Sequence, residues 1–327
     1  MTPNNFLIAY LRRSASFGFG FALIVIFIGF SIAAPNFATI GNVFAMLHAM
    51  GPLTVAACGI ALVILTGKID ISIGAIAFLS ASIPAVLMEQ YGLTPWIGLP
   101  LIVVLGAAMG AINGFLVAYL KIDSLIATLG TMIAFRGLGL MLTDARVIAL
   151  PASAQPLGNL SVGPLSVDTL VMIAVLLGVH FVHRRTTFGR HLNAVGNGEE
   201  IARKVGINTG SVIFKTFVLS GLLAGASAVF SYLQVGSISG FLGKGLEFNS
   251  IAVAVVGGLS LAGGRGRIFP GIVIGALAFQ IIANGLNQIS ASPYVYQLVT
   301  GVVIFIAMYL DAGKSARIGR SLLRTSH

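Results

Sequence analysis

Residues that could do chemistry are few in this sequence, and their spacing excludes the commonest reaction centres. The chain has five histidines and a single cysteine, Cys58. The histidines show no metal-site spacing, and one cysteine excludes both an internal disulfide and a cysteine metal cluster. Gly313-Lys314-Ser315 resembles the end of a phosphate-binding loop, but Met308 stands where that loop needs its first glycine. We therefore expect no catalytic residue, no metal and no cofactor bound by this chain.

A second group of polar residues lies in or beside long apolar stretches: Asp70, Asn113, Arg136, Asn249 and Asn284. Asp70 belongs either to a charged turn or to a broken helix, where it would have a structural or gating role. An unpaired cation in a membrane is costly, so Arg136 either faces protein or water, or extends outward if its segment is shifted by a turn. The asparagines either bond a polar solute or join helices. We treat all five as candidates for a translocation pathway or gate.

The most charged segment runs from 183 to 210, and it contains the signals of a short helix at 199–205. Asn197 is a good N-cap, and Glu200 three residues later can complete a capping box. Gly206 can end the helix in a left-handed conformation. Two opposite-charge pairs at i,i+4 spacing support it: Glu199 with Arg203, and Glu200 with Lys204.

The apolar face of this predicted helix is small and consists of Ile201, Ala202 and Val205. A helix of two turns is marginal in water, so it needs a surface to pack against. From the residues alone, that surface is either the rest of the same chain or a separate cytoplasmic subunit.

The elements that position these residues are predicted to be membrane helices. Hydrophobic residues make up 57% of the chain and charged residues only 9%, against roughly 25% charged in soluble domains. The apolar runs approach the ~20 residues that a helix needs to cross a bilayer, and the 41 glycines fit close helix packing. The first run exceeds a signal-peptide core, so we expect a retained helix. The predicted spans are 17–34, 43–66, 73–88, 96–120, 125–143, 169–182, 211–233, 248–262, 268–287 and 294–310.

The distribution of charge predicts how these spans are oriented. With the N-terminus inside, 16 of the 19 basic residues lie at the cytoplasmic side, as the positive-inside rule requires. This arrangement places both termini and 183–210 in the cytoplasm and puts the irregular loop 144–168 outside. It also explains the net charge of +10 without a nucleic-acid partner. The fold class is therefore an all-α polytopic membrane protein with about ten transmembrane helices.

Four stretches, in order, resemble a known family. They are Leu65-Thr66-Gly67-Lys68-Ile69-Asp70-Ile71-Ser72-Ile73-Gly74; Asn113-Gly114 through Ile126-Ala127-Thr128-Leu129-Gly130-Thr131-Met132 to Arg136-Gly137-Leu138; Phe188-Gly189-Arg190 through Gly196-Asn197 and Glu199-Glu200 to Gly206-Ile207; and Glu247 through Gly257-Gly258 and Gly263-Gly264-Arg265-Gly266 to Asn284-Gly285-Leu286-Asn287. Together they are similar to the ribose/xylose/arabinose/galactoside-type permeases of bacterial ATP-binding-cassette importers. Lys68 departs from this pattern, since the family usually has glycine there.

The resemblance implies a single permease domain over 1–327 in the bacterial inner membrane. Its implied partners are a second permease subunit, a cytoplasmic ATPase that carries ATP and Mg, a periplasmic sugar-binding protein and membrane lipid. The implied solute is a monosaccharide of the ribose type. The residues expected to couple the chain to the ATPase are Phe188, Gly189, Arg190, Asn197, Glu199, Glu200, Ala202, Arg203 and Gly206.

Three other kinds of membrane protein are alternatives to this interpretation. An ion-coupled secondary transporter often holds acids within its spans, whereas the nine acids here are expected at span ends or in loops. A membrane-embedded enzyme would need a nucleophile or a metal constellation, and the sequence shows neither. An importer permease of the same class for a vitamin or for a signalling molecule with a sugar-like core stays open.

Overall fold

The computed structural model describes residues 23–292, 294–306 and 308–309. The predicted orientation of the two termini falls outside these residues. Two helices, Leu23–Ala33 and Tyr294–Ile306, flank the labelled elements. The labelled elements are α2 (Ile40–Ala49), α3 (Gly51–Leu65), α4 (Ile73–Tyr91), α5 (Pro95–Ala118), α6 (Ser124–Thr143), β1 (Ile148–Ala149), α7 (Gln155–Gly158), β2 (Ser161–Val162), β3 (Leu165–Ser166), α8 (Val167–Arg185), α9 (Thr187–Asn197), α10 (Glu199–Lys204), α11 (Thr209–Val235), β4 (Ser237–Ile238), α12 (Leu246–Val256) and α13 (Ile268–Gln288).

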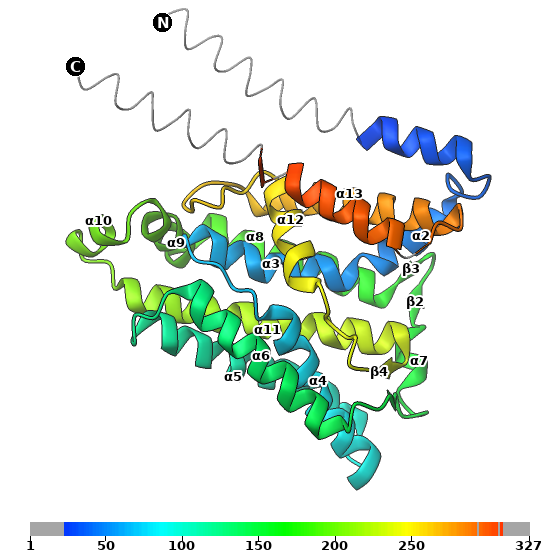
Figure 1. The fold of residues 1–327 in the computed structure, drawn as a ribbon, viewed down its shortest axis with the longest axis horizontal. Helices are drawn as coiled ribbons and strands as arrows, with labels where there is room; N and C mark the ends of the chain where they lie inside the picture. Colours follow the sequence, from blue (N-terminus) through cyan, green and yellow to red (C-terminus); the bar gives the residue numbers. More distant parts are fainter. Residues whose placement is uncertain (1–22, 293, 307, 310–327) are drawn as a thin grey trace, which may run out of the picture.

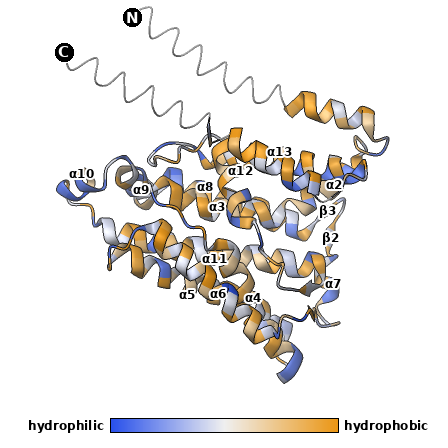
Figure 2. Ribbon diagram, viewed as in Figure 1, coloured by the Kyte–Doolittle hydropathy of each residue, from blue (hydrophilic) through white to orange (hydrophobic). Residues whose placement is uncertain are grey.

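The helices form an all-α polytopic membrane protein, as predicted. Six of the described helices are long and apolar enough to cross a membrane: α4, α5, α6, α8, α11 and α13. The pair α2 and α3, bent by 44°, makes a seventh if it is one span. Figure 2 shows apolar residues along the helices and hydrophilic ones gathered toward both ends of the bundle. The other three predicted spans correspond to shorter apolar helices: Leu23–Ala33, α12 and Tyr294–Ile306.

Several predicted boundaries were wrong. The span predicted at 43–66 is two helices that meet at Met50, and Pro52 in the first turn of α3 fits a new helix start there. The spans predicted at 73–88 and 169–182 are longer, because their flanks continue the helices of α4 and α8 to 19 residues each. The span predicted at 248–262 stops at Val256, and Gly258 follows with a φ of +91°.

Glycines bring the central helices close together. Helix α11 packs on α5, α3 and α4, and its contact with α5 is made backbone to backbone. A Cβ placed on Gly110 of α5 would lie 3.0 Å from the Cα of Gly221 on α11, and one on Gly225 would lie 3.0 Å from the Cα of Val103. Small residues at such crossings are the usual means by which membrane helices pack without a hydrophobic driving force.

The two long loops lie at opposite ends of the bundle. Figure 1 places α9 and α10 at one end, and α7 with the β2–β3 hairpin at the other. The loop 144–168, predicted to be irregular, contains the short helix α7 and three two-residue strands. Its β1 pairs antiparallel with β4, so that Ile148 is opposite Ile238. The pairing fastens this loop to the chain that leaves α11.

The glycine contact between α5 and α11 predicts that a glycine-to-valine substitution lowers stability at Gly110 but not at Gly130. Gly110→Val adds a branched side chain where no room exists, and overpacking of this kind costs about 1–3 kcal/mol or more. We expect a lower melting temperature, or loss of the monodisperse peak, in detergent-purified protein. Gly130→Val on α6 is the control, because no atom lies within 4 Å of a Cβ added there. Equal melting of the two variants would contradict the packing argument.

Candidate functional site

The chain between α3 and α4, residues 66–72, is not helical. We call a non-helical stretch of this kind, between two helices of the bundle, an interrupted segment. Figure 1 shows this one passing from the region of α9 toward the middle of the bundle, where α4 begins. Its backbone is bonded by hydroxyls of α6: the N–H of Ile69 donates to Ser124 Oγ at 3.2 Å, and the N–H of Ile71 donates to Thr128 Oγ1 at 3.2 Å. Irregular backbone at membrane depth is tolerated only where the protein supplies such partners.

Asp70 lies at the centre of a buried polar cluster. Its Oδ1 accepts hydrogen bonds from the backbone N–H of Ser72 at 3.0 Å and from Ser72 Oγ at 2.6 Å. Its Oδ2 accepts one from Ser220 Oγ at 3.3 Å, and Asn113 Nδ2 donates to Ser72 Oγ at 2.7 Å. All four side chains are fully buried. The cluster joins residues 66–72 to α5 and α11, so Asp70 has the structural role that was predicted as one alternative and is more than a charged turn.

A second interrupted segment, 236–245, connects α11 to α12, and Arg136 supports it. Arg136 Nη1 donates to the carbonyl of Leu242 at 2.7 Å and to that of Gly240 at 3.3 Å. Its guanidinium carbon lies 4.9 Å from the centre of the Phe78 ring. Arg136 therefore faces protein instead of extending outward, and it satisfies backbone carbonyls that would otherwise lack donors.

The first turns of α4 and α12 meet. A Cβ added to Gly74 of α4 would collide with the carbonyl oxygen of Gly243 and with Glu247 Oε2. Both helix N-termini carry partial positive charge, and a buried carboxylate accompanies each of them: Asp70 beside α4, and Glu247 in the first turn of α12. Transporters commonly place polar sites where discontinuous helices meet in this way. We call the region formed by Asp70, Gly74, Asn113 and Glu247 the polar junction.

Some polar atoms at the polar junction have no hydrogen-bond partner. Glu247 Oε1 accepts a bond from the N–H of Gly245 at 3.3 Å. Within the described residues, Glu247 Oε2, Asn113 Oδ1 and Ser250 Oγ are buried without a hydrogen-bond partner. Glu247 was not among the site residues predicted from the sequence. The signal that could have found it is a carboxylate at the start of a short apolar run.

The other two asparagine candidates lie apart from this junction or at its edge. Asn249 is half-buried on α12, and its side chain makes no hydrogen bond to the described part of the chain. Asn284 on α13 forms a reciprocal amide pair with Asn42 of α2, with N–O distances of 3.0 and 2.9 Å, and it accepts a bond from Gln288. Contacts of this kind join helices.

The charged inner segment folds as two helices, α9 and α10, of which only the second was predicted. The capping role predicted for Asn197 is wrong: Gly198 precedes α10, and Asn197 Nδ2 donates to the carbonyls of Asn193 at 2.7 Å and Gly264 at 3.2 Å. Gly206 has a φ of +87°, so the predicted left-handed exit is confirmed.

The start of α9 holds three of the predicted coupling residues. Phe188 borders a shallow groove of about 290 Å³ beside α11. Gly189 packs directly against the carbonyl of His183, where no side chain would fit. Arg190 is exposed and donates to Thr187 Oγ1 at 3.2 Å.

The two predicted ion pairs of α10 had different outcomes. Glu200 pairs with Lys204 at 3.1 Å, as predicted. Glu199 does not pair with Arg203: its carboxylate lies 3.2 Å from Lys68 Nζ and 3.7 Å from Lys121 Nζ, which belong to the α3–α4 and α5–α6 connections. Partial burial raises the pKa of Glu199, but the two lysines outweigh that effect and leave its pKa below the ordinary value.

The exposed face of α10 differs from the predicted one. Ala202 is only 3% exposed because α10 lays this side on α9 and α11 of its own chain. Ile201 and Val205 are 69% and 72% exposed, and Arg203 is exposed as well. The apolar face that a partner could reach is therefore Ile201 with Val205, without Ala202.

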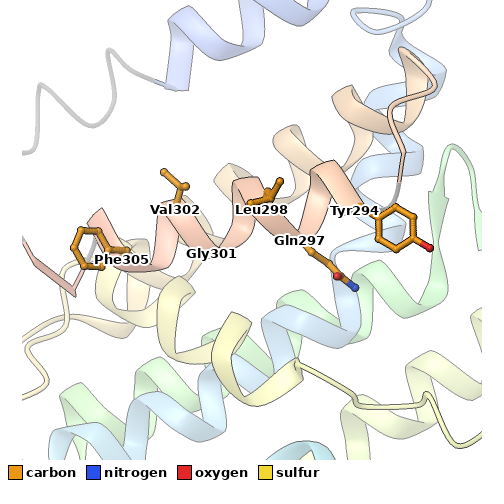
Figure 3. A pocket seen from close by; sticks show the side chains of 6 residues that line it. All are labelled: Tyr294, Gln297, Leu298, Gly301, Val302 and Phe305. Carbon is orange, nitrogen blue, oxygen red and sulfur yellow. The ribbon is translucent and has the colours of Figure 1, made fainter.

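A larger hollow, of about 580 Å³, lies along the helix Tyr294–Ile306. Figure 3 shows that its six lining side chains all come from that one helix: Tyr294, Gln297, Leu298, Gly301, Val302 and Phe305. No other element of the described part of the chain lines this hollow, so among those residues it is an open helix face without an enclosed polar site.

Apolar helices interrupted at a buried polar junction, with a charged helical segment at one end, define a multi-pass membrane transport protein. The family model for the branched-chain amino acid transport system permease component matches residues 42–308, and the chain belongs to this family. It is a permease subunit of an ATP-binding-cassette importer in the bacterial inner membrane.

The curated relatives cover most of the chain. The ribose import permease protein RbsC of Escherichia coli strain K12 is 35% identical over 90% of this chain and 92% of its own length. The D-allose transport system permease protein AlsC of the same strain is 34% identical over 89% of each chain. The autoinducer 2 import system permease protein LsrC of Photorhabdus luminescens is 35% identical over 79% of this chain and 78% of its own. No solved structure matches the chain.

The hydroxyl support of residues 66–72 predicts that Thr128→Val destabilises the protein. Valine keeps the shape of threonine but removes the acceptor for the buried N–H of Ile71, and an unsatisfied buried donor costs about 1–3 kcal/mol. We expect a lower melting temperature in detergent. Thr131→Val is the matched control, because among the described residues the Thr131 hydroxyl bonds the Thr128 carbonyl of its own helix and no backbone N–H of residues 66–72. If both variants melt alike, the hydroxyl does not support this segment.

Proposed function

We propose that this chain imports a monosaccharide, or a solute with a sugar-like core, as one of two permease subunits. The observation that carries the proposal is its similarity, over about nine-tenths of its length, to permeases named for ribose and D-allose. The relative named for autoinducer 2 is the reason for including sugar-like solutes. In this proposal residues 1–327 form a single membrane domain of about ten spans with both termini in the cytoplasm, and the pathway forms between the two subunits.

The translocation pathway is proposed to pass the polar junction. Asp70 and Asn113 lie there, Glu247 and Asn113 each hold an unpartnered acceptor, and Asn249 lies on the same helix as Glu247. Arg136 supports the segment that leads into α12 and would set its position as a gate. Solute hydroxyls are hydrogen-bond donors, which are the groups that these acceptors lack. The hydrogen bonds of Asn284 suit the joining of α2 to α13 instead.

ATP hydrolysis is proposed to occur on a separate cytoplasmic ATPase that docks at α9 and α10. The exposed apolar pair of Ile201 and Val205 would enter the ATPase, and the exposed side chains of Arg190, Glu200 and Arg203 on α9 and α10 would contact its surface. Phe188, Gly189, Asn197, Ala202 and Gly206 would hold the shape of this docking element from within the chain. A periplasmic binding protein would deliver the solute to the opposite end, near α7 and the β2–β3 hairpin.

The docking proposal predicts that Ile201→Asp uncouples the importer. The variant should fold and melt like the parent, because Ile201 packs against little of its own chain. A charge buried without a partner at the docking surface should abolish ATPase association and reduce transport in proteoliposomes at least about tenfold. Ile201→Met, which stays apolar, is the control. The proposal fails if Ile201→Asp supports full ATP-driven uptake, or if the chain alone hydrolyses ATP.

The proposed orientation predicts opposite labelling at the two ends. On a Cys58→Ser background, a membrane-impermeant thiol reagent added to right-side-out vesicles should modify Ser153→Cys and spare Arg185→Cys. Both positions are exposed. Inside-out vesicles should reverse the result, and the same pattern in both preparations would reject the topology.

A further inference from the structure

We propose that Lys68 is a positioning residue that acts through Glu199 to make the interrupted segment 66–72 follow the movement of α10. The inference rests on the proposed docking of an ATPase at α10. It adds a specific route by which movement there reaches the polar junction.

The contact that carries the inference joins three separate parts of the chain. Glu199, the first residue of α10, holds Lys68 at 3.2 Å with Oε2 and Lys121 at 3.7 Å with Oε1. The side chains of Lys68 and Glu199 are 29% and 31% exposed, whereas Lys121 is 57% exposed. The shorter and better-covered contact is therefore the one to Lys68.

Backbone contacts hold the same elements together beside this ion pair. Gly196, near the end of α9, packs directly on the carbonyl of Leu65 at the end of α3, and Gly264 donates its N–H to that carbonyl at 3.0 Å. Asn197 Nδ2 reaches the carbonyl of Gly264 at 3.2 Å. The unit of α9 and α10 thus lies on the end of α3 and on the loop that follows α12.

The position of Lys68 in the chain lets its contact with Glu199 connect α10 to the polar junction. Lys68 stands two residues before Asp70 and four before Ser72, within a segment that has no helix of its own. The N–H of the next residue, Ile69, is bonded to Ser124 at the start of α6. A displacement of Glu199 therefore reaches the Asp70 cluster along a few residues of non-helical chain.

A second ion pair on α10 offers a matched comparison. Glu200 and Lys204 lie within the same helix, with side chains 70% and 73% exposed, and touch no other element through this pair. Glu199 and Glu200 both lie in the first turn, so each interacts favourably with the helix dipole. Of these two glutamates, Glu199 is the one whose ion pair connects α10 to residues 66–72.

The test uses the assembled importer in proteoliposomes and measures solute moved per ATP hydrolysed. Glu199→Gln and Lys68→Gln should each lower this ratio about threefold, the size expected for a partly exposed pair, while the ATPase stays associated. Lys121→Gln should have a smaller effect. Glu89→Gln should leave the ratio unchanged, because it breaks a partly exposed ion pair with Arg146 in the loop 144–168, away from α10. In the double variant, Lys68→Gln should add nothing to Glu199→Gln, because the two residues act as one contact. Raising the salt concentration should lower the ratio of the parent but not that of Glu199→Gln.

The inference is overturned if Lys68→Gln and Glu199→Gln lower the ratio additively, or if Glu89→Gln lowers it equally. It is also overturned if the variants lose the ATPase, because Glu199 would then be a docking residue. These outcomes differ from failure of the proposed docking itself, which would appear as full coupling in the Ile201→Asp variant. A melting temperature unchanged in all variants is expected, and a fall limited to Lys68→Gln and Glu199→Gln would assign the pair a purely structural role.

Discussion

The structure depends on one constraint: inside a membrane, each backbone N–H and C=O group must find its partner within the protein. A continuous helix meets this requirement by itself, but residues 66–72 and 236–245 are not helical. Side chains of α6 bond some of these backbone groups: Ser124 and Thr128 accept from one segment, and Arg136 donates to the other. Helix α6 is therefore a support that both interruptions share.

Because side chains of α6 bond the backbone of both non-helical segments, the N-terminal ends of α4 and α12 can meet inside the bundle. Close approach at Gly74 and Gly243 leaves no room for side chains, and the neighbouring carboxylates of Asp70 and Glu247 lie beside the positive ends of α4 and α12. The continuous helices α5 and α11 contribute only the uncharged side chains of Asn113 and Ser220 to this cluster. The two carboxylates come from the non-helical segment 66–72 and from the first turn of α12, so the interruptions account for how a chain with only 9% charged residues places carboxylates in its interior.

The sequence was sufficient to predict the apolar helices, and it also singled out Asp70 and Arg136, because polar residues stand out within apolar runs. It could not predict their partners: Ser220 is 150 residues from Asp70, and Leu242 is 106 from Arg136. The faces of α10 were assigned wrongly because periodicity identifies the apolar positions Ile201, Ala202 and Val205 but not which of them the chain itself covers. Glu199 was paired within its helix by spacing, whereas tertiary packing brings Lys68 nearer.

Buried hydrogen bonds and exposed ion pairs differ in strength, and this difference decides which contacts can rearrange. Breaking a buried hydrogen bond such as that of Ile71 to Thr128 leaves an unsatisfied group at about 1–3 kcal/mol, whereas exposed ion pairs contribute roughly 0–1 kcal/mol. Movement of α10 should therefore alter the peripheral contacts of Glu199 while the interior around Asp70 and α6 shifts as a unit. The backbone contact of Gly196 with Leu65 persists without the ion pair. Loss of Lys68 or Glu199 should accordingly weaken the connection between α10 and the polar junction without abolishing it.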